Sequence, residues 1–386
     1  MKVIILGGAG DMGSRAVREL AQDPEVERLT IADANLQAAE RLAGSLGGAP
    51  VDVARVDARD HDALRATVSG YDVAASAIGP FYLFEELVAS AVVDAGVPYV
   101  SICDDYDGTQ AVLGLDARAR QAGVAVLTGL GWTPGISNVL ARKAADALEE
   151  VEEVNVSWAG SASDSEGFAV ILHTIHIFTG QVPSYRDGRE LRVRAGSGRE
   201  RVRFPEPVGQ VDVYHVGHPE PVTIPRFMPG VRTVTLKGGL SEAPLNRLAI
   251  ALARARLTDT PEKKERLGRL IERALPVLSR LGKPAQPCSA IRVDVRGRAG
   301  GEARTVSYGA AGHMAALTGV PLAIGAKMLA AGEIEARGVV APEACVPPDR
   351  FLAELGRRGI PVYEMGVDRA VNAEGVPVHD LARASG

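Results

Sequence analysis

Apolar residues in the first third of the chain alternate between short β-branched runs and stretches with the 3.6-residue period of an amphipathic helix. The runs predict strands, and the stretches between them predict crossover helices. The predicted strands are residues 1–6, 28–33, 51–56, 72–78, 99–102 and 124–128. The helices predicted after the second strand are residues 36–46, 61–68, 85–95 and 113–122. Regular alternation of this kind predicts a doubly wound parallel sheet.

The pattern changes after about residue 140. A strand is predicted at 151–159, a helix at 168–178, short strands broken by Gly and Pro at 181–239, and a long charged helical region at 242–280. Residues 289–295 and 304–309 read as a hairpin with its tip at 296–301, and helical periodicity returns at 313–334. This mixture predicts an α+β domain with a mixed or antiparallel sheet. We therefore expect domains at 1–140 and 141–312, with a C-terminal helical segment at 313–386 that packs back on the first domain.

A glycine-rich turn follows the first predicted strand. It contains Gly8, Gly10, Asp11, Met12 and Gly13, and a helical pattern comes after it. In the order strand, turn and helix, this is the dinucleotide-binding fingerprint of the Rossmann fold. We expect Gly8 to permit the tight turn, Gly10 to let a pyrophosphate approach, and Gly13 to let the helix sit close to the sheet. The amide groups at the helix start would hold the phosphate charge.

Asp33 ends the second predicted strand, where an acidic side chain can accept hydrogen bonds from an adenosine ribose. Ala34 and Asn35 follow, so no adjacent cation would bind a 2′-phosphate. This favours NAD over NADP as the coenzyme. The alternative is an ordinary strand-end Asp that caps the helix starting near Asn35.

Ligands of open α/β sheets bind outside the carboxyl ends of the strands, so residues there are further candidates. Asp57 follows the third strand, near the expected adenine. The turn after the fourth strand suits a backbone lying along the nicotinamide ribose, and it consists of Ala77, Ile78, Gly79 and Pro80.

Acid–base candidates follow the fifth strand. Asp104 and Asp105 could position an amine or take its proton, or they could form an Asx-type turn. Cys103 is a weaker nucleophile candidate, since no His or helix start is evident beside it. After the sixth strand, Thr133 could cap a helix that starts at Pro134, and its amide groups would then suit a substrate carboxylate.

Four histidines form two HxxH pairs in the second predicted domain: His173 with His176, and His215 with His218. Their number allows zinc, but no acid partner is obvious, and we expect no metal. His176 is the candidate for proton transfer, and buried structural imidazoles are the alternative.

Substrate carboxylates require fixed cations. Arg226, and Lys237 just before two glycines, are the candidates, although most such residues are simply solvated.

Composition narrows the function classes. The net charge of −5 and the 4% of aromatic residues give no case for nucleic-acid binding. The three cysteines are scattered, as expected in a reducing compartment, and no apolar stretch reaches membrane-spanning length. We expect a cytoplasmic protein that acts on a small molecule without contacting membranes.

The combined pattern resembles the saccharopine dehydrogenase-like family over nearly the whole chain. The resemblance rests on the glycine turn, Asp33, the segments 77–81 and 121–124, and Pro134-Gly135-Ile136-Ser137-Asn138. The last segment is similar to the Pro-Gly-x-x-Asn of the lysine 6-dehydrogenase branch, and carboxynorspermidine dehydrogenase is another similar branch. Saccharopine reductases usually have Asp before that Pro and a His further along, whereas this chain has Thr133 and Asn138.

The resemblance implies NAD(P)-linked oxidation or reduction at a C–N bond of an amino acid or related amine, in a homodimer. His176 or Asp104 would carry the proton, and Arg226 and Lys237 would bind the carboxylate. A non-catalytic NAD-binding sensor or scaffold is the alternative, because a fold does not fix a function. A semialdehyde-type dehydrogenase is a third option, which would require an activated Cys103.

Overall fold

The computed structural model describes residues 1–47, 51–164, 167–278, 284 and 286–366. The chain divides into two compact units: residues 1–136 with 315–346, and residues 137–314 with 347–386. They are called here the first and second unit, and each is described by itself. Residues 367–386 of the expected C-terminal segment lie outside the described residues.

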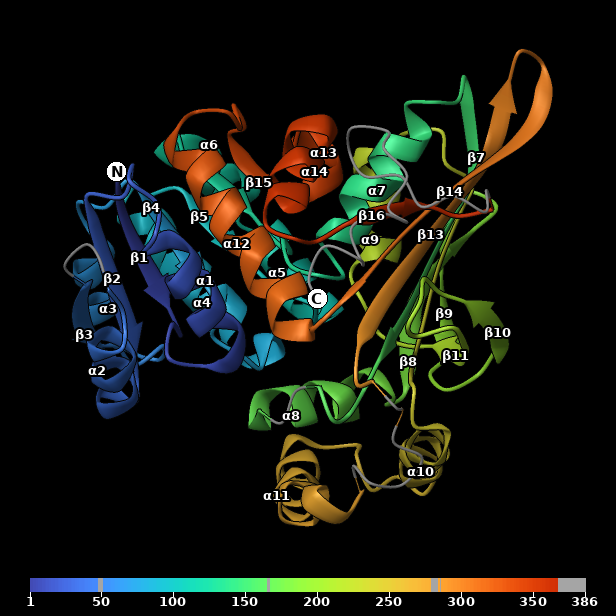
Figure 1. Cartoon of the computed structure of the whole chain (residues 1–386), viewed down its shortest axis with the longest axis horizontal. Coiled ribbons are helices and arrows are strands. Elements are labelled where there is room, and N and C mark those ends of the chain that lie inside the picture. Colours follow the sequence, from blue (N-terminus) through green and yellow to red (C-terminus); the bar gives the residue numbers. More distant parts are fainter. Residues whose placement is uncertain (48–50, 165–166, 279–283, 285, 367–386) are drawn as a thin grey trace, which may run out of the picture. The chain divides into compact units, whose positions relative to one another are not determined.

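The first unit is built on a seven-stranded parallel sheet in the order β15-β6-β5-β4-β1-β2-β3 (Figure 1). The strands are β1 (Lys2–Leu6), β2 (Arg28–Asp33), β3 (Val51–Arg55), β4 (Val73–Ser76), β5 (Tyr99–Ser101), β6 (Ala125–Leu127) and β15 (Gly338–Val340). Val3 to Leu6 of the central β1 are fully buried, which is why this strand is apolar on both faces. The six predicted strands and the Rossmann-like α/β class are confirmed. The seventh strand was not predicted.

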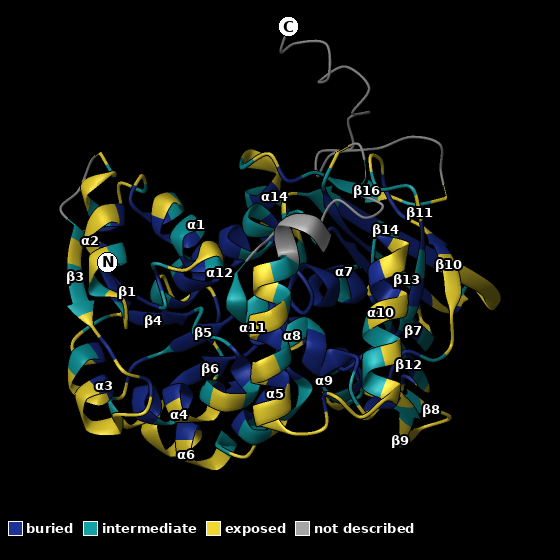
Figure 2. Cartoon of the chain, turned by 90° about the horizontal axis from the view of Figure 1, so that it is seen from below, coloured by how far each residue is buried: buried dark blue, intermediate teal, exposed yellow. Residues whose placement is uncertain are grey.

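Helices cover both faces of this sheet (Figure 2). They are α1 (Asp11–Leu20), α2 (Leu36–Gly44), α3 (His61–Val68), α4 (Phe81–Asp94), α5 (Tyr106–Leu113), α6 (Asp116–Ala122), most of α12 (Met314–Ala330) and α13 (Pro342–Cys345). The helix predicted at 113–122 is confirmed as α6, which begins three residues later, at Asp116, whereas α5 before it was not predicted. Helix α12 packs tightly on α1: a Cβ at Gly319 would lie 2.6 Å from the carbonyl oxygen of Met12.

The second unit contains a mixed sheet in the order β10-β11-β12-β7-β13-β14-β16, with β8 paired to β12 and β9 paired to β8. The strands are β7 (Glu150–Gly160), β8 (Gln181–Arg186), β9 (Arg189–Arg194), β10 (Glu200–Arg203), β11 (Gln210–His215), β12 (Thr233–Leu240), β13 (Ser289–Ala299), β14 (Glu302–Gly312) and β16 (Val362–Glu364). Among the described strands of this sheet, β12 and β7 are the pair that runs in parallel. The predicted mixed sheet is confirmed, but the hairpin tip is shorter than expected, since the strands extend to Ala299 and Glu302.

The second unit contains six described helices, of which α9 lies where the sequence pattern predicted strands. They are α7 (Ile136–Ala145, from its second residue), α8 (Phe168–Ile177), α9 (Glu220–Phe227), α10 (Ala243–Arg254), α11 (Pro261–Leu278) and α14 (Pro348–Arg357). The prediction of short strands throughout 181–239 is wrong at Glu220–Phe227, which form α9 with one proline in the first turn and Pro225 in the interior. The helical region at 242–280 is two helices, and Pro261 starts the second one.

None of the helices in the described residues is long and apolar enough to cross a membrane.

Candidate active site

The glycine turn, residues 7–13, joins β1 to α1 and leaves room for a ligand. The residue with a positive φ is Gly7 (73°), so the tight turn expected at Gly8 occurs one position earlier. A Cβ at Gly13 would lie 2.2 Å from the carbonyl oxygen of Gly7, so only glycine fits there. A Cβ at Gly10 would meet nothing nearer than 3.5 Å, so the space beside it is open. Helix α1 begins at Asp11, and its first amide groups have no acceptor within the helix. This geometry fits a dinucleotide pyrophosphate.

Asp33 fixes the outer side of this turn. One carboxylate oxygen accepts a hydrogen bond from the Ala9 amide (3.0 Å) and the other accepts one from the Asn35 amide (2.9 Å). Asn35, and not Asp33, caps α2. The parallel register also places Arg55 directly beside Asp33 on the neighbouring strand. This cation was not predicted from the sequence, because Arg55 lies on the next strand and not among the residues that follow Asp33.

The segment 77–80 lies against the glycine turn. The Ala77 amide donates to the carbonyl oxygen of Leu6 (2.8 Å), and a Cβ at Gly7 would come within 2.9 Å of the Ala77 backbone. Pro80 immediately precedes α4. The structure thus brings together the glycine turn, Asp33 and the predicted segment 77–80. Asp57 follows β3, and its carboxylate accepts from the Arg59 amide (3.0 Å).

The three residues 103–105, which follow β5, differ in burial and in their hydrogen-bond partners. Asp105 is fully buried, and its carboxylate accepts from the Tyr82 amide at the start of α4 (3.0 Å). Asp104 is half-buried. Cys103 is fully buried, and burial together with the nearby Glu85 raises the pKa of its thiol well above 9. A reactive thiolate at Cys103 is therefore disfavoured, which weakens the semialdehyde-type alternative.

Glu85, which sequence reasoning missed, forms a buried cluster with two residues of β5. Its carboxylate accepts from the Ser101 hydroxyl (2.5 Å) and from the Tyr99 hydroxyl (3.1 Å). Burial raises the pKa of Glu85 to about 7. These three residues are called the Glu85 cluster. The sequence does show an acidic residue within an apolar helix, which could have indicated this cluster, but the pattern does not show whether the Glu85 side chain faces the sheet or the solvent.

The turn after β6 differs from the prediction. Helix α7 begins at Ile136, so Thr133 is not its N-cap and Pro134 is not its first residue. The Gly131 amide donates to the Pro134 carbonyl (3.0 Å), and the Ile136 amide donates to the Gly131 carbonyl (2.9 Å). The second bond occupies one amide group, that of Ile136, near the helix start that had been expected to bind a carboxylate.

A buried polar cluster lies within the second unit and includes the two residues that end the Pro-Gly-x-x-Asn segment. The Ser137 hydroxyl contacts a carboxylate oxygen of Glu220 (3.0 Å) and the side-chain oxygen of Asn138 (3.0 Å). Nδ1 of His218 lies 3.7 Å from the other oxygen of Glu220. All four residues are at most 2% exposed. They are called the Glu220 cluster. No acid partner was obvious from the sequence, but the structure brings Glu220, two residues later, next to His218.

The predicted His173–His176 pair separates on α8. The His173 ring meets the His218 ring edge to face, with centroids 5.3 Å apart. Nδ1 of His176 instead lies 2.6 Å from Nζ of the buried Lys264 on α11. His173, which is half-buried, therefore joins the Glu220 cluster, and His176 does not.

Lys237 and Arg226, the cations predicted to bind a substrate carboxylate, differ in whether an acidic side chain already neutralises them. Nζ of Lys237 is ion-paired with Glu200 (2.6 Å). Arg226 is exposed in the last turn of α9, with its guanidinium 5.8 Å from the centroid of the Phe227 ring.

Comparison with known proteins gives a consistent result. Residues 3–127 match the family model of the saccharopine dehydrogenase NADP binding domain, and residues 223–360 match that of the saccharopine dehydrogenase C-terminal domain. The carboxyaminopropylagmatine dehydrogenase of Synechocystis sp. is 22% identical over 95% of this chain and 98% of its own length. The apo saccharopine dehydrogenase (L-Glu forming) from Saccharomyces cerevisiae has the same fold, with a TM-score of 0.63 and 18% identity over 93% of this chain and 98% of that chain.

Proposed function

This chain belongs to the saccharopine dehydrogenase family, and on that premise we propose that it is a nicotinamide-dependent dehydrogenase acting on a C–N bond of an amino acid or related amine. The observation that carries the proposal is the coincidence of the matched family domains with a glycine turn whose backbone has room for a pyrophosphate. The two family models together cover most of the chain, so the proposal does not depend on the turn alone.

The coenzyme that we propose is NAD. The Asp33 carboxylate is held by two backbone amides at the end of β2, where it would accept from ribose hydroxyls and repel a 2′-phosphate. NADP is the second candidate, because Arg55 lies beside Asp33 and the matched family domain is described as NADP binding.

Bound nicotinamide would supply the hydride acceptor or donor. The protein's own groups must then hold the substrate and move one proton. Asp104 and His176 remain our candidates for that proton, and the structure adds His173. His173 is half-buried, and its ring packs against that of His218, which in turn lies 3.7 Å from Glu220, an arrangement that would orient the His173 ring. Arg226 is the better candidate for a substrate carboxylate, since Glu200 already neutralises Lys237.

A spectrophotometric screen tests the proposal. NAD and NADP are offered with lysine, saccharopine, carboxyaminopropylagmatine and norspermidine-type amines, and the appearance of reduced coenzyme is followed by its absorbance. We expect turnover with at least one amine. A melting shift with NAD but no turnover on any substrate, in either direction, would instead support the sensor alternative.

Three variants separate the proton candidates. We expect His173→Ala and Asp104→Asn to lower kcat by about 100-fold or more, the range for lost general acid–base catalysis. If His176→Ala and Asp104→Asn both retain wild-type turnover, those two assignments are wrong and His173 alone remains.

A further inference from the structure

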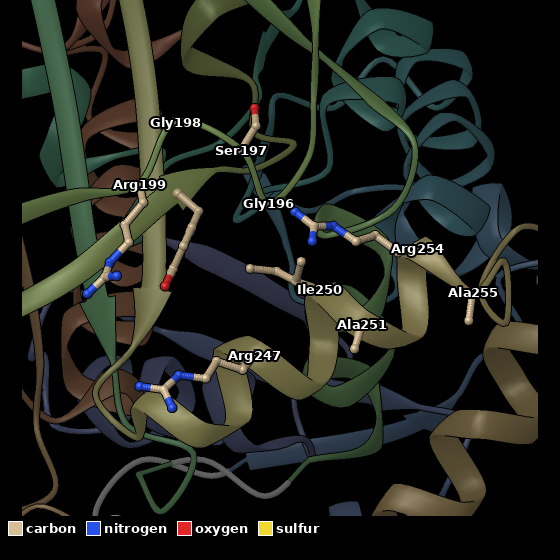
Figure 3. A pocket seen from close by; sticks show the side chains of 10 residues that line it. Gly196, Ser197, Gly198, Arg199, Arg247, Ile250, Ala251, Arg254 and Ala255 are labelled. Atoms are coloured by element: carbon tan, nitrogen blue, oxygen red, sulfur yellow. The ribbon is translucent and has the colours of Figure 1, made fainter.

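A cavity of about 770 Å³ lies wholly within the second unit and includes neither the Glu220 cluster nor any other residue given a role above. Three arginines line it: Arg199, Arg247 and Arg254. Figure 3 shows that Arg247 and Arg254 come from one helix, α10, and that Arg199 comes from a different part of the chain. Tyr214 and Ile250 also line it, so the cavity offers apolar as well as cationic surface.

The spacing of the arginines limits the size of the ligand. Arg247 and Arg254 are two helical turns apart on α10, which corresponds to about 10 Å along the helix axis. Ile250 and Ala251 lie between them on the same face. Two arginines whose backbone positions are this far apart on one helix match an elongated molecule with more than one anionic group better than a single small ion.

The cavity has an excess of positive charge. Arg199 is ion-paired with Asp212 (2.6 Å), but Asp212 also holds Arg201 (3.0 Å), so one carboxylate serves two guanidinium groups. The two cations lower the pKa of Asp212, which keeps it charged. Neither Arg247 nor Arg254 has an ion pair or hydrogen bond with another residue in the part of the chain that the structure describes.

The loop of residues 196–199, which lines the cavity beside α10, is closely packed. Gly198 has a φ of +64°, and a Cβ there would lie 2.4 Å from the ring of His215. Gly196 has a φ of +73°, and a Cβ there would lie 2.7 Å from Ile250. The loop that carries Arg199 is therefore packed closely against β11 and α10, so this side of the cavity is preformed, as in typical small-molecule sites.

We propose that this cavity binds a small organic anion bearing at least two phosphate or carboxylate groups. Guanidinium groups recognise both kinds of group through paired N–H donors, and the apolar lining accommodates the carbon framework. The site is separate from the proposed dehydrogenase chemistry, and its test does not depend on activity.

Calorimetric titration of the full chain at fixed ionic strength tests this. Inorganic pyrophosphate represents phosphate ligands, and citrate represents polycarboxylates. The cavity variant is Arg247→Gln with Arg254→Gln. The matched control is Arg266→Gln with Arg273→Gln, which removes two exposed arginines seven residues apart on α11 that do not line the cavity.

We expect wild-type protein and the control to bind at least one probe equally, and the cavity variant to bind it at least tenfold more weakly. The stronger probe identifies the anion class. Arg254→Gln alone should give an intermediate loss. The proposal is overturned if neither probe binds wild-type protein, or if the cavity variant and the control lose affinity equally, since the effect would then be general charge.

Discussion

The glycine turn of the first unit and the Glu220 cluster of the second unit are built in opposite ways. The turn consists of consecutive residues, and the groups that we propose hold the coenzyme there are backbone amides. The Glu220 cluster joins side chains about 80 positions apart, from α7 and from the start of α9 with the residues just before it. The turn has no room for an added Cβ at Gly7 or Gly13, whereas the side-chain cluster depends on its hydrogen bonds. Substitutions should therefore have different consequences in the two places.

The largest effect is expected from Gly13→Ala. The new Cβ would overlap the Gly7 carbonyl at 2.2 Å, which forces the turn open. We expect coenzyme affinity to fall more than 100-fold and the free energy of unfolding to fall by about 3 kcal/mol or more. Fluorescence titration with NADH and urea unfolding measure the two effects. Gly44→Ala, at an open position at the end of α2, is the control and should change stability by no more than about 1 kcal/mol.

Glu85→Gln tests a side-chain cluster inside the first unit. Because burial raises the pKa of Glu85 from 4.5 to about 7, the folded protein keeps a proton that the unfolded chain releases above pH 4.5. Stability from this group is therefore fully present below pH 4.5 and is lost as the pH rises to 7, by about 3 kcal/mol in total. Urea unfolding between pH 4.5 and 8 should show this decline in wild-type protein but not in Glu85→Gln.

The exposed neighbour Glu86 supplies the control for that comparison. Glu86→Gln should retain the wild-type pH dependence. Identical slopes in Glu85→Gln and wild-type protein would mean that Glu85 does not titrate in this range.

Ser137→Ala tests the Glu220 cluster directly. It removes a hydroxyl that contacts a fully buried carboxylate, so we expect a loss of about 1.5–3 kcal/mol in unfolding free energy. Coenzyme affinity should not change, because the cluster lies in the second unit. Ser69→Ala, at an exposed helix end, should cost no more than about 0.5 kcal/mol. Equal losses in the two variants would show that the Ser137 hydroxyl does not stabilise the buried carboxylate of Glu220.

Asp33→Ala is expected to have the smallest effect, on coenzyme choice. NAD affinity should fall about tenfold, equivalent to about 1.4 kcal/mol, while NADP affinity falls less because the repulsion of the 2′-phosphate disappears. Parallel titrations with NADH and NADPH measure the ratio. If wild-type protein prefers NADPH and Arg55→Ala removes that preference, Arg55 determines specificity and our proposal of NAD is wrong.

The sequence alone determined the Rossmann-like sheet, the glycine turn with Asp33, and the family. These features are local, since each depends on the periodicity of a segment or on adjacent residues whose backbone makes the site. Only the tertiary structure placed Arg55 beside Asp33, turned Glu85 inward against Tyr99 and Ser101, and separated His173 from His176. Such contacts join residues far apart in the chain, and the direction of a side chain depends on the element that packs against it, so no pattern along the sequence records them.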